Sequence, residues 1–448
     1  IVLPVLQYGI ILAHFQPVIL QKREASLFAL FIIKTGILVH KPLTHVEMNR
    51  PLMIISVIFL IITGCSSEDV AILESPDGSI RFILDLDEEG AMSYDLLYKD
   101  SLILECGNLG LEEAELGNLG RALRIVSIDP FKRDEIWRPV YGERSEIRDH
   151  FRGLKVYLKH LEELNPGIYL EIRAYDEGIA FRYEIPFNGP YALVKEHTSF
   201  PFTHEVSGWV SQHAQGSISK KDLNSIEGAC ERPLLVEVNN DRYAALGEAA
   251  LVDFARMKFI RDEQRENCLL SELSGDVQGS GTVLTPWRFV MLGASPAEIL
   301  ENNDFILNLN APGQIGDPSW IHPGKVIREV TLTTSGGKAC VDFAEKYNLQ
   351  YVEFDAGWYG NEYDDASDAT TVTVDPRRSA GPLDLHEVIR YAHERDIKII
   401  LYVNRRALEK QLDELLPLLK SWGVAGLKYG FVNVGPQQWT SWLHEAVR

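Results

Sequence analysis

Residues 398–431 read KIILYVNRRALEKQLDELLPLLKSWGVAGLKYGF, and this stretch decides the fold of the second half of the chain. The apolar run 398–403 predicts a buried strand, residues 408–422 have the spacing of an amphipathic helix, and residues 424–431 predict a second strand. A strand, a helix and a strand in this order imply parallel strands joined by a helical crossover.

The same alternation occurs upstream of this stretch, after residue 313. We predict strands at residues 325–333 and 351–354, helices at residues 337–347 and 385–395, and a broken helix after residue 431. Four consecutive units of this kind imply a parallel sheet. Either a doubly wound sheet or the first half of a (β/α)₈ TIM barrel fits them.

The preceding region, from about residue 69 to 315, has a different pattern. Short alternating runs such as 79–86, 154–159 and 179–185 are separated by turn clusters such as Ser75-Pro-Asp-Gly78. This pattern is typical of a large antiparallel β-sandwich. The predicted fold class is therefore a β-sandwich followed by an α/β domain.

Composition argues against several classes of protein. The 448 residues include 64 acidic and 44 basic side chains, which gives a net charge of −20. Such a charge repels phosphate backbones, so we expect no nucleic-acid partner. The five cysteines lie far apart and form no CxxC pair, which argues against a zinc knuckle or a disulfide framework.

The start of the chain carries a targeting signal. Met48 precedes an apolar run, residues 51–62, that is too short to span a bilayer comfortably. Ile62-Thr-Gly-Cys65 resembles the bacterial lipobox, which predicts a signal peptide over residues 48–64 and lipidation of Cys65. The protein would then be held at the membrane by a lipid anchor only. The alternative is an uncleaved signal anchor.

Both ends of the chain indicate a fragment. Residues 1–47 contain no methionine and are interpreted as upstream, non-native sequence. Residues 436–448 stop inside an amphipathic helix without a Gly or Asn cap. We therefore expect the parent protein to continue beyond Arg448.

Polar residues follow the predicted strands. The strand ends read Phe354-Asp355-Ala-Gly-Trp358, Tyr402-Val-Asn404-Arg405 and Lys428-Tyr-Gly430, and none contains a glycine-rich phosphate turn. In a barrel such residues gather at one mouth. An acid, an aromatic ring, an amide and cations around one mouth suit a neutral polyhydroxylated ligand, which favours a sugar and a barrel.

Six stretches together resemble glycoside hydrolase family 97. They are Ser75-Pro-Asp-Gly78, Leu246-Gly-Glu-Ala-Ala-Leu-Val-Asp253, Thr285-Pro-Trp-Arg288, Ser319-Trp-Ile-His-Pro-Gly-Lys325, Phe354-Asp-Ala-Gly-Trp358 and Gly426-Leu-Lys428. The resemblance implies a sandwich over residues 65–315 and a partial catalytic barrel over residues 316–448. It also implies calcium dependence and a bacterial periplasmic or outer-membrane location, where α-linked oligosaccharides are degraded.

The resemblance bears on mechanism through the fourth strand. Retaining relatives read Lys-x-Asp there, whereas this chain reads Lys428-Tyr-Gly430. An inverting enzyme leaves room for a water between its carboxyls, so we interpret Gly430 as a water pocket. Tight packing is the alternative reason for this glycine. In the inverting branch the third strand ends in a glutamate; Asn404 here could orient water without accepting its proton.

Several individual residues have both a functional and a structural interpretation. The resemblance implies that Glu248 ligates calcium, although it could be a surface strand residue. Asp355 and Trp358 are expected to bind the sugar, but Asp355 could merely cap a turn. Lys428 is expected to contact substrate, or else to extend to the barrel rim.

Two further segments carry candidate residues. Asn404 and Arg405 are expected to bind substrate, although Arg405 could simply begin a solvated helix. The acidic run 362–365 is interpreted as a solvated loop rather than a metal site. The general acid and base are expected beyond Arg448, on later strands.

The resemblance, read together with Gly430, implies an exo-acting, inverting, calcium-dependent α-glucosidase that acts on α-linked oligosaccharides. The alternatives are an α-galactosidase of the same family and a non-catalytic carbohydrate-binding lipoprotein. Residues 1–448 are expected to be inactive by themselves, because half a barrel exposes unpaired strand edges.

Overall fold

A computed structural model describes residues 70–161, 165–432 and 434–447. The predicted upstream segment 1–47, the signal peptide 48–64 and the lipidation site Cys65 lie outside the described residues. Among the described helices, none is both long and apolar enough to cross a membrane.

The first half of the described chain consists of antiparallel sheets. The first sheet has the order β1-β2-β3-β4, with bounds Val70–Glu74, Ile80–Leu86, Met92–Tyr98 and Ser101–Asn108. A three-stranded sheet has the order β11-β17-β16, with bounds Ser199–Pro201, Cys268–Leu273 and Met257–Arg261.

The largest sheet has twelve strands and the main path β13-β12-β14-β15-β19-β10-β9-β8-β7. Along this path the bounds are Ser219–Asp222, Ser207–Val210, Leu234–Asn239, Arg242–Ala249, Trp287–Gly293, Gly178–Glu196, Ile168–Tyr175, Ile147–His160 and Leu123–Trp137. Off the path lie β18 (Val277–Leu284), β5 (Leu111–Glu113) and β6 (Gly117–Asn118). A short 3₁₀ helix, Leu223–Ser225, follows β13.

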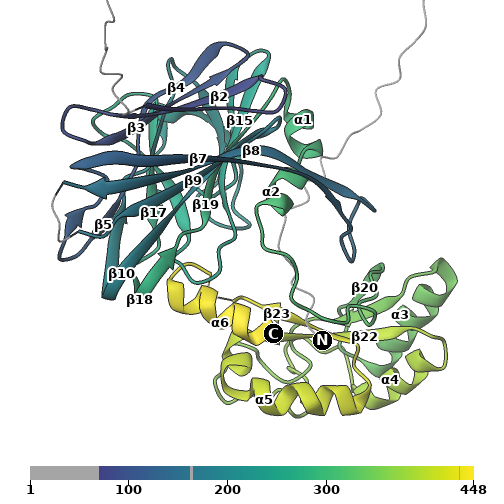
Figure 1. Ribbon diagram of the computed structural model, residues 1–448. Coiled ribbons are helices and arrows are strands. Elements are labelled where there is room, and N and C mark those ends of the chain that lie inside the picture. Colours follow the sequence, from purple (N-terminus) through teal and green to yellow (C-terminus); the bar gives the residue numbers. More distant parts are fainter. Residues whose placement is uncertain (1–69, 162–164, 433, 448) are drawn as a thin grey trace, which may run out of the picture. The chain divides into compact units, whose positions relative to one another are not determined.

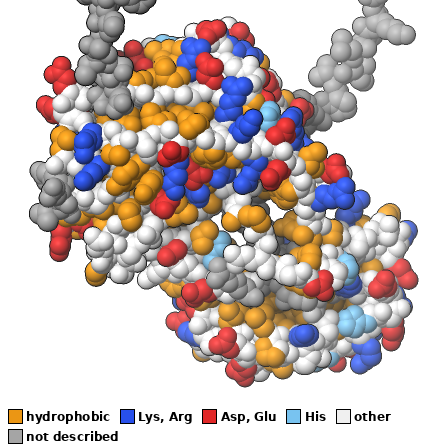
Figure 2. Space-filling model, in the orientation of Figure 1, with side chains coloured by type: hydrophobic (Ala, Val, Ile, Leu, Met, Phe, Trp, Pro, Cys, Tyr) orange, Lys and Arg blue, Asp and Glu red, His pale blue; other side chains and the backbone are white. Residues whose placement is uncertain are grey.

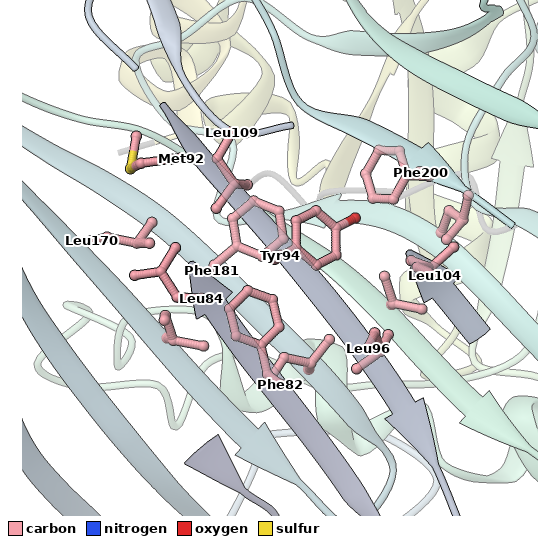
Figure 3. Packing of buried hydrophobic residues seen from close by; sticks show 14 of the residues in the cluster. Phe82, Leu84, Met92, Tyr94, Leu96, Leu104, Leu109, Leu170, Phe181 and Phe200 are labelled. Atoms are coloured by element: carbon pink, nitrogen blue, oxygen red, sulfur yellow. The ribbon is translucent and has the colours of Figure 1, made fainter. Parts of the chain in front are cut away.

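The sheets share one apolar core. Alternate residues of β2 and β3 are buried, as expected for strands with one face in a core. Figure 3 shows Phe82 and Tyr94 beside Phe181 of the largest sheet; the rings of Phe82 and Tyr94 stack with centroids 5.1 Å apart, and Phe181 lies 6.1 Å from Phe82. This layered β region agrees with the predicted sandwich.

Two short helices follow the β region, α1 (Pro296–Glu301) and α2 (Asp304–Asn308). The Ser295 side chain accepts a hydrogen bond from the Glu298 N–H and so caps α1. Pro296 at the first helical position needs no hydrogen-bond partner, which is why the helix begins here.

The second half of the described chain is a four-stranded parallel sheet in the order β20-β21-β22-β23. Its strands are Val326–Glu329, Tyr351–Phe354, Lys398–Asn404 and Gly426–Gly430. The helices are α3 (Thr334–Tyr347), α4 (Leu385–His393), α5 (Arg405–Trp422) and α6 (Gln437–Val447). The predicted alternation of strands and helices is therefore confirmed.

The arrangement of these helices discriminates between the two predicted α/β folds. Figure 1 shows α3, α4 and α5 on one side of the sheet, and their apolar residues form one cluster with the strands. A doubly wound sheet has helices on both faces, whereas a barrel segment has them outside only. The sequential strand order also suits a barrel segment, but closure into eight strands stays a prediction.

Capping residues explain where the observed helices differ from the predicted ones. The Asn404 side chain accepts from the Arg406 N–H, so α5 begins at Arg405, three residues before the predicted start. Thr333 caps α3 in the same way through Gly336. Gly423, with φ +84°, ends α5 in the left-handed region that glycine tolerates best.

Charged side chains of both signs are interspersed over the visible face in Figure 2. Intermixed charges limit local repulsion even though the chain carries a net charge of −20.

Candidate functional site

Polar side chains gather on the face of the parallel sheet that lies opposite its helices. Successive side chains of a strand point to opposite faces, so alternate residues share this face with one another. Buried apolar residues such as Val352 and Leu401 occupy the helix side. The polar set on the other face comprises Arg328, Glu353, Asp355, Tyr402, Asn404 and Lys428.

Ion pairs link three strands within this set. The Lys428 ammonium lies 2.8 Å from Oε1 of Glu353 and 3.6 Å from Oδ1 of Asp355. The Asp355 carboxylate also pairs with Arg328 and accepts from the Ala356 N–H. Asp355 thus has the turn-capping contact that its sequence context allowed. Lys428 stays 32% exposed, so a ligand could still reach its ammonium.

The space beside Gly430 is filled. A Cβ built on Gly430 would overlap Cε2, Cζ and the hydroxyl oxygen of Tyr402, closer than any van der Waals contact allows. The interpretation of Gly430 as a water pocket is therefore wrong for this structure, because an aromatic ring occupies the gap. Its packing alternative holds: the glycine lets the Tyr402 ring lie against β23.

Asn404 is held by local bonds. Its side chain is buried, caps α5 through Oδ1 and donates from Nδ2 to the Tyr402 hydroxyl at 3.1 Å. Its N–H donates to the Tyr359 hydroxyl at 2.9 Å. Burial raises the pKa of Tyr359 to about 12, so this phenol stays neutral at ordinary pH. Both polar atoms of the Asn404 amide are thus engaged in structural bonds.

Two predicted sugar-binding residues lie away from the polar set. Trp358 has no exposed surface, and its Nε1 donates to the backbone carbonyl of Tyr402 at 2.7 Å. The prediction that Trp358 offers a flat face to a sugar fails here, because the indole packs inside the apolar cluster. Arg405 pairs with Glu409 one turn later at 3.3 Å, as its solvated-helix alternative anticipated.

Glu248 belongs to a buried ion-pair cluster of the β region. One of its oxygens pairs with Arg232, and the other lies 2.8 Å from Nη1 of Arg288. With both oxygens on guanidinium groups, this side chain does not fit the predicted calcium ligand. Among the described residues there is no group of three or more side chains that could hold a metal ion. We therefore assign calcium no role in the chemistry of the described residues.

Three residues of the polar set were missed from the sequence, namely Arg328, Glu353 and Tyr402. Period-two alternation was the available signal. Glu353 stands two residues before Asp355, and Tyr402 stands two residues before Asn404, so each shares a face with a residue that was predicted.

Comparison with known proteins now identifies the family. A family model described as "Glycosyl-hydrolase 97 N-terminal" matches residues 73–312, and one described as "Glycoside hydrolase 97" matches residues 321–448. The chain belongs to glycoside hydrolase family 97. The predicted resemblance is confirmed.

Two curated relatives of this family 97 chain have names that include alpha-galactosidase. It is 24% identical over 435 residues to a "Retaining alpha-galactosidase" of Bacteroides thetaiotaomicron. This match covers 84% of this chain and 62% of the relative. It is also 24% identical over 376 residues to a "Probable retaining alpha-galactosidase" of Streptomyces bingchenggensis, covering 80% of this chain and 56% of the relative.

Solved structures give the same fold. One of them is a family 97 enzyme from Pseudoalteromonas sp. strain K8, which was solved in complex with acarbose and, as a variant, in complex with panose. It matches this chain with a TM-score of 0.75 and 24% identity. The match covers 84% of this chain and 64% of that chain. A β-arabinopyranosidase matches with a TM-score of 0.69 and 16% identity over the same shares. The chain spans less than two thirds of the length of the relatives it matches.

The ion pair at the sheet face of this family 97 chain gives a testable prediction. Lys428→Met should lower the free energy of unfolding by about 1–3 kcal/mol, because the buried Glu353 carboxylate loses its partner. Adding Glu353→Gln should restore most of that loss, since the uncompensated charge is then gone. Urea denaturation of the wild type and the three variants checks this. Additive losses in the double variant would contradict it.

Proposed function

We propose that the complete protein is an exo-acting α-glycosidase that acts on α-linked oligosaccharides. Membership of a glycoside hydrolase family supports this reaction class. The observation that carries the proposal is the polar set at the carboxyl ends of the parallel strands. In barrels, substrate is bound at this end of the sheet.

Asp355 and Lys428 would bind and orient the sugar in this proposal. A carboxylate accepts hydrogen bonds from sugar hydroxyls, and an ammonium donates to them. The pairing of Lys428 with Glu353 and Asp355 holds these groups at one point of the sheet, which reduces the ordering cost on binding. None of the described residues is proposed to donate or accept the proton in the reaction.

The sugar itself has two candidates. An α-glucoside is our first choice, and the panose and acarbose complexes of the structural neighbour are consistent with a chain of sugar units. An α-galactoside is the second, because both curated relatives are named α-galactosidases. A panel of nitrophenyl α-glycosides discriminates between them.

We further propose that the reaction inverts the anomeric configuration. A retaining mechanism needs a nucleophilic carboxylate about 5 to 5.5 Å from the acid, and the fourth strand offers Gly430 under the Tyr402 ring instead. The water would be held elsewhere in the complete site.

The experiment is proton NMR of the first product formed by the complete protein. We expect the first product to have the anomeric configuration opposite to that of the substrate. Retention of the configuration would contradict the inverting mechanism. Failure to release product from any α-glycoside would contradict the proposed glycosidase activity. Binding without turnover would favour the carbohydrate-binding alternative, which the lack of carboxylates at Asn404 and Gly430 supports. Repeating the assay with a chelator tests the predicted calcium dependence, for which we expect lost activity.

We also propose attachment to the bacterial membrane, facing the periplasm, through a lipid on Cys65. The lipobox-like sequence supports this. Cys65→Ala should move the protein from the detergent phase to the aqueous phase in a partition assay. Equal partition of both forms would contradict the anchor.

A further inference from the structure

A second polar hollow lies beside the polar set, under the long loop between β21 and α4. The loop and the first turns of α5 line a partly open cavity of about 200 Å³. Its lining includes Tyr359, Glu362, Asp364, Ser367, Arg406 and Lys410. Pockets for drug-sized ligands measure about 300–1,000 Å³, so this smaller cavity suits a single small ring.

Glu362 carries an unused acceptor at this cavity. Its side chain is only 1% exposed, and Oε1 accepts from Nη2 of Arg378 at 2.8 Å. The other oxygen, Oε2, is buried and has no hydrogen-bond partner among the described residues. A buried carboxylate oxygen is normally satisfied, so this one calls for a donor from outside the described chain.

Carboxylates outnumber cations around the cavity, although most of them have a partner. Asp365 lies 3.2 Å from the Arg406 guanidinium and 3.4 Å from the Lys410 ammonium, while Asp368 accepts from Gln411 at 2.6 Å. Glu362 pairs with Arg378, so three cations stand against the four carboxylates Glu362, Asp364, Asp365 and Asp368. The excess of negative charge disfavours a free phosphate, and among the described residues no group of three or more His, Cys, Asp or Glu side chains could hold a metal ion. A neutral ligand that donates hydrogen bonds fits better.

Exposed aromatic rings flank the same loop. Tyr363 stands between Glu362 and Asp364 and is 49% exposed, and Phe431, directly after β23, is 63% exposed. Their ring centroids lie 6.0 Å apart. Flat apolar rings left in water beside polar acceptors suit the C–H face of a pyranose.

We propose that this loop forms a second carbohydrate-binding site, which takes one hexose unit of an α-linked oligosaccharide. Sugar hydroxyls donate to Glu362 Oε2 and to Asp364, and the Tyr363 and Phe431 rings support the neighbouring unit. Phe431 directly follows Gly430, so one oligosaccharide can extend from the polar set to this loop. The ligand class rests on the proposed function.

Isothermal titration of the full chain with maltotriose and with raffinose tests the site. Wild type should bind one of them, and Glu362→Gln and Asp364→Asn should each weaken binding by about tenfold. Asp364 is exposed, so its variant keeps the test valid if Glu362→Gln fails to fold. Glu414→Gln, an exposed carboxylate of α5, is the matched control and should bind like the wild type.

The outcomes separate this site from the proposed function. If Asp355→Asn weakens binding while the Glu362 and Asp364 variants match the wild type, this inference fails and the proposed function stands. If the wild type binds neither trisaccharide, both fail. If calcium raises the melting temperature of the wild type but not of Glu362→Gln, the cavity is a cation site and the inference is overturned.

Discussion

Gly430→Ala is expected to lower the free energy of unfolding by about 1–3 kcal/mol, because the new methyl group must displace the Tyr402 ring. The Tyr402 ring is buried and lies against Gly430 of β23, and its hydroxyl accepts a hydrogen bond from Asn404, so the ring has little freedom to move. Thermal or urea unfolding of the two proteins measures the loss.

A double-mutant cycle assigns this loss to the ring. In a Tyr402→Ala background the same Gly430→Ala change should cost much less, since the space is then open. Tyr402→Phe keeps the ring and should keep the full cost, which separates the ring from its hydroxyl. Gly189→Ala is the matched control within a strand, because a Cβ there meets nothing within 4 Å. Equal costs in the wild-type and Tyr402→Ala backgrounds would refute the packing argument.

Arg288→Met is expected to be the most damaging single change, at about 3–5 kcal/mol. Arg288 is buried on β19 and pairs with Glu196 at 2.6 Å and with Glu248 at 2.8 Å. Burial alone would lower the pKa of this guanidinium, but the two carboxylates outweigh burial and raise it. Methionine removes the charge and leaves Glu196 buried without its cation.

Urea unfolding of the β region checks this second prediction. Arg124→Met, at an exposed position of β7, should change stability by no more than about 0.5 kcal/mol. Combining Arg288→Met with Glu196→Gln should recover part of the loss, since the orphaned charge is then absent. A loss no larger than that of Arg124→Met would show that the cluster does not stabilise the fold. It would also reopen a ligand role for Glu248.

Much of the candidate site could be predicted because strand ends are local features. Asp355 and Lys428 were found from apolar runs that stop at polar residues, and the structure brings them to 3.6 Å. Trp358 illustrates the limit of this reasoning. It follows the same strand end, yet its indole turns into the apolar cluster and bonds to a carbonyl of β22. Nothing in its own segment specifies that direction.

The sequence by itself determined the order of strands and helices and the parallel sheet, because apolar periodicity acts over a few neighbouring positions. The family followed from the resemblance of six short stretches, which can be read without the structure. Only the tertiary structure decided what lies beside Gly430, where Trp358 points and what Glu248 bonds to. These outcomes depend on side chains from other segments. The Tyr402 ring and Gly430 are 28 positions apart, and they meet only because two parallel strands align in register.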